Sequence, residues 1–233
     1  MFPISEHYKF EEIFDDPKAN LPEVDELDSF KFEQNKFWYH GMYVLIDNCW
    51  VETLAKWLSG NNENGNIARF YEVMAGRGWL AKALEISGIQ IDASDSGDDY
   101  TDRKSLDLPE NITNAVFHVE NQRALEVADE IIEYVHGNPG SRVAVIICYP
   151  PETSSAYDFI KRLPEKTFII YIGDEDFIFT ANKEFKNSIT WLHQNSNHPD
   201  NSLLEGFPKE FNIEGVHANH NNFEDVVIWL GVV

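Results

Sequence analysis

The sequence predicts an α/β fold: a doubly wound, mostly parallel seven-stranded sheet with an N-terminal helical extension. Residues 69–95 have the pattern of a strand, a glycine turn, a helix and a second strand. Apolar runs of strand length then alternate with helical patterns, which is typical of a parallel sheet. The last two strand patterns have no helix between them, which indicates an antiparallel pair. The expected strands begin near residues 70, 89, 115, 143, 167, 211 and 225.

Length and charge limit the classes of function. The chain has 233 residues and 43% hydrophobic content, enough for one α/β domain with an extension. Its formal net charge of −22 repels phosphate backbones, so DNA and RNA are disfavoured as partners. A small molecule, or a basic protein or peptide, is easier to accommodate. The alternative explanation of the acidic composition is that the negative charge only keeps the protein in solution.

Cysteine and hydropathy patterns bear on the compartment. Cys49 and Cys148 lie inside apolar patterns and form no CxxC or Cys/His spacing, so neither a zinc site nor a disulfide framework is indicated. The N-terminus has no basic segment followed by an apolar one, and no apolar run approaches the roughly 20 residues that span a bilayer. We therefore expect a soluble, cytoplasmic protein without a membrane partner.

The N-terminal part, residues 1–66, is expected to form an acidic arm and a helix, and residues 67–233 a Rossmann-like domain. The acidic, turn-rich segment 1–36 carries scattered aromatic residues, which favours short helices packed on the domain, or a lid. Apolar residues at helical spacing predict a helix over 42–58. The aromatic cluster at 37–40 either anchors the start of this helix or lies near the glycine turn.

The unit at 69–95 has the properties of a nucleoside-binding device. Gly76 and Gly78 allow a tight turn and a close approach of the backbone to a ligand, and the following helix offers free N–H groups at its N-terminus. Asp95, at the end of the second strand, can accept hydrogen bonds from both hydroxyls of a ribose. A glycine pair after a strand also occurs in many α/β proteins without a ligand.

The remaining elements follow from the same patterns. The expected elements are a strand over 115–119, a helix over 124–135, a strand over 143–149, a helix over 156–163, a strand over 167–172, a weak helix over 185–192, and strands over 211–216 and 225–232. Candidate metal ligands are Asp98, Asp99, Asp102, His217 and His220, but a solvated acidic face and polar turn chemistry explain them better. No metal site is predicted.

A diproline follows the apolar run at 143–149, which reads as a central strand covered on both faces. Proline fixes the backbone dihedral φ, so Pro150 and Pro151 hold Tyr149 and Glu152 in a rigid segment. The diproline either orients groups for chemistry or simply ends the strand.

These motifs resemble those of the class I S-adenosylmethionine-dependent methyltransferases over about residues 42–233, without indicating a subfamily. Glu72-Val-Met-Ala-Gly76-Arg-Gly78 is similar to motif I, and Asp95 to motif II. Met74 stands where that family has the first of three glycines, which narrows the space for the methionine part of the cofactor. The resemblance implies S-adenosyl-L-methionine as cofactor, and the residues it would place there are Glu72, Gly76 and Gly78 at the methionine part, Asp95 at the ribose and Gln122 at the adenine edge.

The Tyr-Pro-Pro-Glu segment resembles motif IV of the amino-group methyltransferases, which is Asn or Asp followed by two prolines and an aromatic residue. Tyr149 replaces the amide or carboxylate and Glu152 replaces the aromatic residue. The resemblance places Tyr149, Pro150 and Glu152 at the methyl acceptor. A phenol is a poor base at neutral pH but a good hydrogen-bonding group, so an amine acceptor is in question.

The sequence therefore predicts a methyltransferase that acts on a small molecule or a protein. Methyl transfer is a displacement at an already activated sulfonium, so alignment can supply most of the catalysis. The alternative is a non-catalytic binding or scaffolding protein that keeps the fold, which Met74 and Tyr149 favour. A dinucleotide oxidoreductase fits the glycine pattern and the diproline poorly. The sequence does not indicate the oligomeric state.

Overall fold

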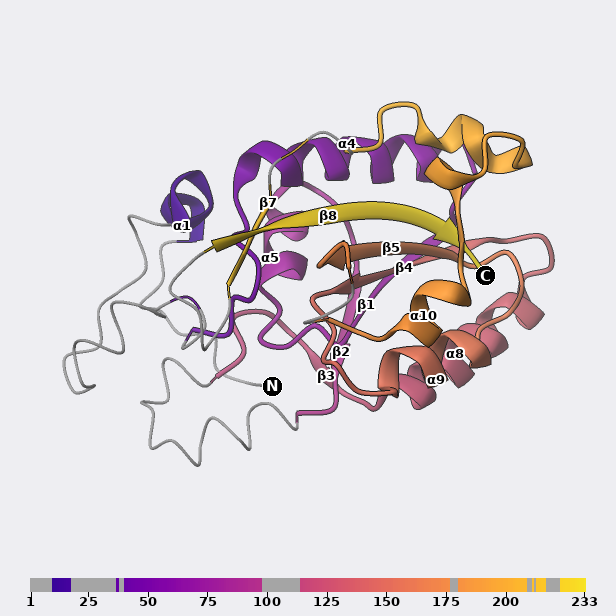
Figure 1. The fold of residues 1–233 in the computed structure, drawn as a ribbon, viewed down its shortest axis with the longest axis horizontal. Coiled ribbons are helices and arrows are strands. Elements are labelled where there is room, and N and C mark those ends of the chain that lie inside the picture. Colours follow the sequence, from indigo (N-terminus) through magenta and orange to yellow (C-terminus); the bar gives the residue numbers. More distant parts are fainter. Residues whose placement is uncertain are drawn as a thin grey trace.

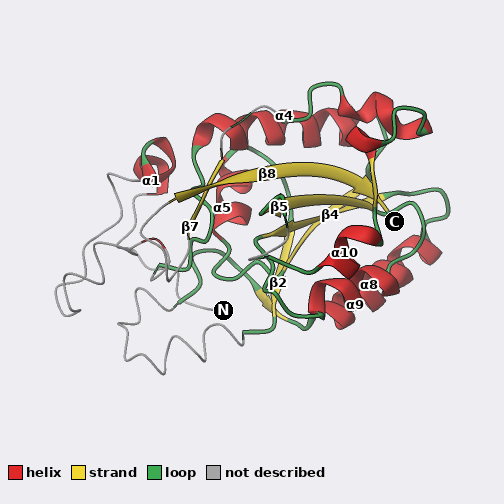
Figure 2. Cartoon of the chain, viewed as in Figure 1, coloured by secondary structure: helices red, strands yellow, loops and turns green. Residues whose placement is uncertain are grey.

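The computed structural model describes residues 10–17, 37, 40–97, 114–176, 180–208, 211, 213–216 and 223–233. In this part of the chain a twisted sheet lies between two layers of helices (Figure 1, Figure 2). The strands are β1 (Arg69–Val73), β2 (Asp92–Asp95), β3 (Glu120–Asn121), β4 (Val143–Cys148), β5 (Phe168–Gly173), β6 (Thr190–Trp191), β7 (Ile213–Val216) and β8 (Phe223–Val232).

The strand order is β3-β2-β1-β4-β5-β8-β6, and β7 pairs with β8 outside this path. The first five strands of the path are parallel, whereas β8 runs antiparallel to β5, β6 and β7. The predicted mostly parallel sheet, with seven strands in its main path and an antiparallel pair at the end of the chain, is confirmed. The prediction missed β6, a two-residue edge strand that places β8 inside the sheet.

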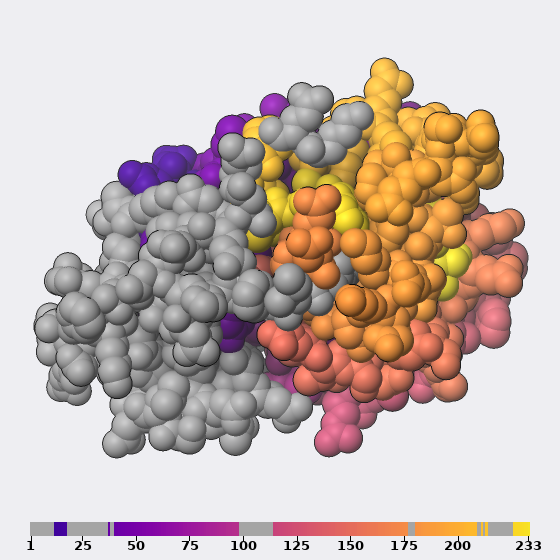
Figure 3. All heavy atoms as spheres, in the orientation of Figure 1, coloured from indigo at the N-terminus to yellow at the C-terminus, as the bar shows by residue number. Residues whose placement is uncertain are grey.

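Helices cover both faces of the sheet, as doubly wound topology requires (Figure 1). The helices among the described residues are α1 (Phe10–Asp15), α4 (Asn48–Glu63), α5 (Trp79–Ile86), α8 (Ala124–Gly137), α9 (Ser155–Arg162) and α10 (Lys183–Asn187), with 3₁₀ turns η1 (Leu192–Gln194) and η2 (Pro199–Leu204). One core joins α4 and α5 to one face, and a second core joins α8, α9 and α10 to the other. In Figure 3, residues 180–208 (orange) form a surface beside the salmon-coloured α9 region, in line with the contact between α10 and α9.

Helix α4 differs in its bounds from the predicted helix over 42–58. It begins at Asn48 because the Asp47 side chain accepts hydrogen bonds from the N–H groups of Cys49 (2.8 Å) and Trp50 (3.3 Å). It then runs on through Glu63, beyond the predicted end at residue 58. The apolar residues at 42–46 are mostly buried without being helical, so their spacing reports burial only.

Two further segments depart from the sequence pattern. The strand expected over 115–119 is not formed, and β3 pairs with β2 only at Glu120 and Asn121. Ala115, Val116 and Val119 are nevertheless buried in the core beside α5. The helix expected over 185–192 ends at residue 187, after which the chain enters β6. Short apolar segments are ambiguous because a buried loop has the same pattern as a buried strand.

Candidate functional site

The predicted site lies at the carboxyl ends of β1, β2 and β4, the edge at which open α/β sheets bind ligands. The turn between β1 and α5 has left-handed backbone at Met74 (φ 61°), Gly76 (φ 55°) and Gly78 (φ 81°). Glycine adopts this conformation freely, whereas a residue with a Cβ loses about 1–2 kcal/mol. Met74 therefore holds a strained position that a glycine would fill more easily. Its side chain packs against the core on the α8 and α9 face.

The two glycines of the turn have different roles. A Cβ on Gly78 would lie 2.7 Å from Val119 Cγ2 and 2.9 Å from Phe117 Cβ. Gly78 is therefore needed where the start of α5 packs against 117–119. A Cβ on Gly76 would meet no described atom within 4 Å, so the backbone at Gly76 leaves room for a ligand. Among the described atoms, therefore, Gly78 is closely packed and Gly76 is not.

Asp95 ties the turn to the end of β2. Its Oδ2 accepts a hydrogen bond from Gly76 N–H (2.9 Å), and its Oδ1 accepts one from Gly97 N–H (2.8 Å). The N–H of Gln122 donates to the Asp95 carbonyl oxygen (2.9 Å). The structure thus brings Gly76, Asp95 and Gln122 together.

Glu72 lies in β1, between β2 and β4, one residue before the strand ends at Val73. It is paired in register with Ala93 of β2 and Ile146 of β4, and only 2% of it is exposed. Its carboxyl accepts a backbone hydrogen bond from Ala81 in the first turn of α5, and Oε2 has no hydrogen-bond partner in the described part of the chain. A buried polar atom without a partner is unusual and points to a missing ligand or water.

Burial, opposed by the Ala81 hydrogen bond and reinforced by the nearby charge of Asp95, raises the pKa of Glu72 to about 8. The carboxyl is therefore mostly protonated at neutral pH. Burial, together with the proximity of Glu72, also raises the pKa of the Cys148 thiol well above its usual range. Cys148 is thus a neutral thiol at the end of β4.

The predicted acceptor residues follow β4. Tyr149 has left-handed backbone (φ 53°), and its N–H donates to the Ile172 carbonyl oxygen (2.7 Å). Its ring is parallel to that of Tyr43, with an interplanar angle of 4° and 6.2 Å between centroids. Pro150 is buried, and its carbonyl oxygen accepts a hydrogen bond from the backbone N–H of Ala181 (3.1 Å). Glu152 is exposed.

Arg77, which the sequence gave no reason to single out, organises the outer side of the turn. It is fully buried; its Nε donates to the Asn114 carbonyl oxygen and its Nη1 to that of His40 (2.7 Å). Trp79 Nε1 donates to the same His40 oxygen (2.8 Å). The segment at His40 therefore lies against the glycine turn, one of the two placements considered for the cluster at 37–40. Trp38 and Tyr39 of this cluster lie outside the described residues.

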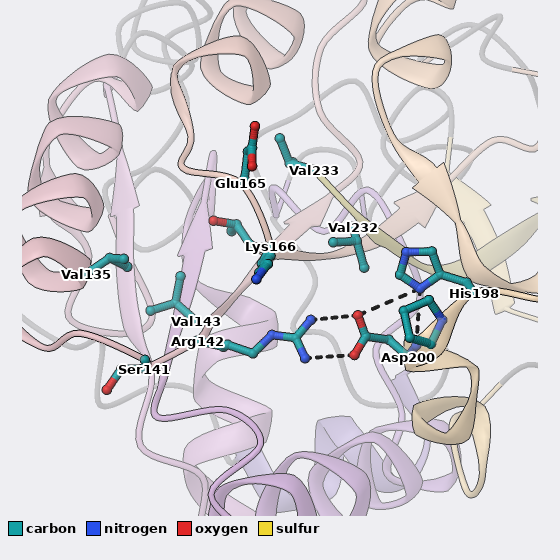
Figure 4. Close-up of a pocket in the computed structure, with 13 residues that line it drawn as sticks. Val135, Ser141, Arg142, Val143, Glu165, Lys166, His198, Asp200, Val232 and Val233 are labelled. Atoms are coloured by element: carbon teal, nitrogen blue, oxygen red, sulfur yellow. Dashed lines mark hydrogen bonds and ion pairs between the residues drawn. The ribbon is translucent and has the colours of Figure 1, made fainter.

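A concavity lies at the edge opposite the predicted site, where β4 and β5 begin (Figure 4). Its volume is about 760 Å³. Arg142 Nη1 and Nη2 donate to the two carboxylate oxygens of Asp200, each at 2.8 Å, and the Asp200 N–H donates to His198 Nδ1 (3.2 Å). The hydrogen bonds from Arg142 hold the pKa of Asp200 below its usual range. This pocket shares no residue with the predicted site, and its Arg142 and Asp200 are paired with each other.

The candidate metal ligands Asp98, Asp99, Asp102, His217 and His220 lie outside the described residues. Within the part that is described, no three His, Cys, Asp or Glu side chains are grouped so that they could hold a metal. In the same part, no helix has the length and apolar character needed to cross a membrane.

Comparison with known proteins gives only distant likenesses. No family model and no curated protein matches the sequence. Among solved structures, a magnesium protoporphyrin IX methyltransferase from Synechocystis PCC 6803 with bound SAM is 10% identical, with 95% of this chain and 94% of that chain covered and a TM-score of 0.40. A SAM dependent methyltransferase from Archaeoglobus fulgidus is 10% identical, covering 77% and 94%, with a TM-score of 0.34.

A geranyl diphosphate C-methyltransferase from Streptomyces coelicolor A3(2) is 9% identical, with 97% and 99% covered and a TM-score of 0.32. Likenesses at these scores identify neither a family nor an activity. The function must therefore be argued from the residues of the site itself.

Proposed function

We propose that this chain is an S-adenosyl-L-methionine-dependent methyltransferase acting on a small molecule or a protein. The observation that carries the proposal is the turn at 74–78, in which three alternate residues have left-handed backbone. Asp95 fixes this turn, Gly76 leaves room beside it, and the buried Glu72 carboxyl has an oxygen without a described partner. In this proposal the cofactor domain spans 67–233, and residues 1–66 form the acidic arm and helix.

The residues fit the proposed cofactor. The Glu72 oxygen that has no described partner suits a positively charged amino group. The Asp95 carboxylate lies at the end of β2 beside Gly76, where it would meet the ribose hydroxyls. Gln122 would meet the adenine edge, which its backbone hydrogen bond to the Asp95 carbonyl supports by holding it close to Asp95. When bound, the cofactor supplies a methyl group on an activated sulfonium; the residues of the chain bind it, orient it and exclude water.

The acceptor side of the proposal is Tyr149, with Pro150 behind it. In the resembling motif a proline carbonyl helps to orient an amine, but here the Pro150 carbonyl already accepts a hydrogen bond from Ala181. Glu152 is exposed and bonds to no described residue. These contacts favour an acceptor that meets the face of an aromatic ring and a phenol, and they argue against an amine. The net charge of −22 argues against nucleic acid.

The second candidate is a binding or scaffolding protein that keeps the fold without catalysis. The observation in its favour is the strained backbone of Met74 and Tyr149, both non-glycine residues at positions where the resembling motifs have a glycine and an amide or acid. A strained backbone conformation persists only where the surrounding structure enforces it, and such conformations are often found at functional sites, which include ligand-binding sites. Turnover separates the two candidates, because both allow ligand binding.

Calorimetric titration with S-adenosylhomocysteine tests the proposal. The wild type should bind, and Asp95→Asn should weaken binding about 10- to 100-fold, because charge-assisted hydrogen bonds are worth about 1.5–3 kcal/mol. Asp129→Asn is the matched control, since Asp129 is exposed on α8 and far in sequence from the turn. Asp95 also holds Gly76 and Gly97, so unfolding of each variant should be measured in parallel. No binding by the wild type at millimolar ligand would contradict the proposal.

A further inference from the structure

The groups around Glu72 leave it without a positive partner among the described residues. Asp95 approaches from β2 and the Cys148 thiol from β4, and α5 contributes the Ala81 N–H. The described hydrogen bonds of the Arg77 guanidinium go to the carbonyl oxygens of His40 and Asn114. The surroundings of Glu72 thus combine one acid, one neutral thiol and one backbone donor.

An ionised carboxylate in these surroundings is costly. The Glu72 carboxyl is buried away from solvent, and one of its oxygens has no described partner. A second carboxylate, that of Asp95, lies close by. A proton on Glu72 removes that cost. A ligand cation placed beside Oε2 removes it as well, because it supplies the missing partner.

We propose that Glu72 carries a proton in the free protein and releases it to solvent when a positively charged ligand binds. The inference rests on the proposed function, which makes S-adenosylmethionine the cationic ligand. The step is a proton exchange only: the O–H bond of Glu72 breaks, the proton goes to buffer, and an ion pair replaces it. No bond of the ligand changes.

Proton release makes affinity depend on pH in a defined direction. With a pKa of about 8, Glu72 is about 90% protonated at pH 7, so binding of a cation releases up to about 0.9 proton. The dissociation constant of the cationic ligand should therefore decrease as the pH rises from 5.5 to 7, by a factor of nearly ten for each pH unit. A neutral ligand needs no ionisation of Glu72, so its affinity should be flat over this range.

Isothermal titration in two buffers of different ionisation enthalpy measures the protons released. The ligands are S-adenosylmethionine and the neutral 5′-methylthioadenosine, and the proteins are the wild type and Glu72→Gln. Glutamine is neutral and has the shape of protonated glutamate, so the variant is a matched control. At pH 7 we expect the wild type to release about 0.9 proton more than Glu72→Gln on binding S-adenosylmethionine, and no such difference with 5′-methylthioadenosine.

Equal proton release by the two proteins would overturn the inference while leaving the proposed function intact. Failure of the wild type to bind S-adenosylmethionine would overturn both. An infrared difference spectrum between the free wild type and Glu72→Gln at pH 7 provides a readout without ligand. It should show the carbonyl band of one protonated carboxyl in the wild type, and its absence would also overturn the inference.

Discussion

Replacing Glu72 with glutamine should change how stability depends on pH. The folded protein holds the pKa of Glu72 at about 8, against 4.5 for an ordinary glutamate. Because the pKa is raised on folding, the stability associated with this group is fully present below about pH 4.5 and is lost as the pH rises through about 8. Between pH 5 and 8 the loss is about 3 kcal/mol, since one pKa unit is worth about 1.4 kcal/mol. That is a large part of a typical domain stability of about 5–15 kcal/mol.

Urea unfolding at pH 5, 6, 7 and 8 measures this effect. Glu72→Gln should lie close to the wild type at pH 5 and be more stable than it by about 3 kcal/mol at pH 8. Glu52→Gln is the control for net charge, because Glu52 is exposed on α4. Many other carboxylates titrate in both proteins, so the difference between variant and wild type is the quantity that counts. Parallel curves for Glu72→Gln and the wild type would refute the reasoning.

Three further predictions concern the turn, the end of β4 and the charge. Gly78→Ala should be more destabilising than Gly76→Ala in urea unfolding, because only the Cβ at 78 meets atoms closer than 3 Å; equal losses would count against this account of the turn. Tyr149→Phe should leave the affinity for S-adenosylhomocysteine nearly unchanged while altering any turnover, and an equal loss of affinity would remove Tyr149 from the acceptor side. Fluorescence anisotropy should detect no binding to duplex DNA or RNA at physiological salt, because the net charge is −22; submicromolar, salt-sensitive binding would contradict that expectation.

The central unit of the fold could be predicted because its signals are local. An apolar run, two glycines and a helical pattern define β1, the turn and α5, and the acid at residue 95 ends β2 as expected. The start of α4 was predicted too early because buried residues in an extended segment had helical spacing. Asp47 carried the true signal, as a helix-capping residue directly before residue 48.

The candidate site could be predicted only in part. Glycine spacing and the acid after β2 placed Gly76 beside Asp95, but no pattern distinguishes a glycine required by packing, such as Gly78, from one that leaves room for a ligand. The buried Arg77 was missed because an arginine in a glycine turn is usually exposed, and its hydrogen bonds join segments far apart in the chain. The parallel rings of Tyr43 and Tyr149 were missed for the same reason.

The most direct test of the central claim is a crystal structure of the protein with S-adenosylhomocysteine. The ribose hydroxyls should lie within hydrogen-bonding distance of the Asp95 carboxylate, with the amino group of the ligand beside Glu72 and its backbone next to Gly76. Ligand bound instead in the pocket of Arg142 and Asp200 at the opposite edge, or no ligand at the glycine turn at saturating concentration, would contradict the claim.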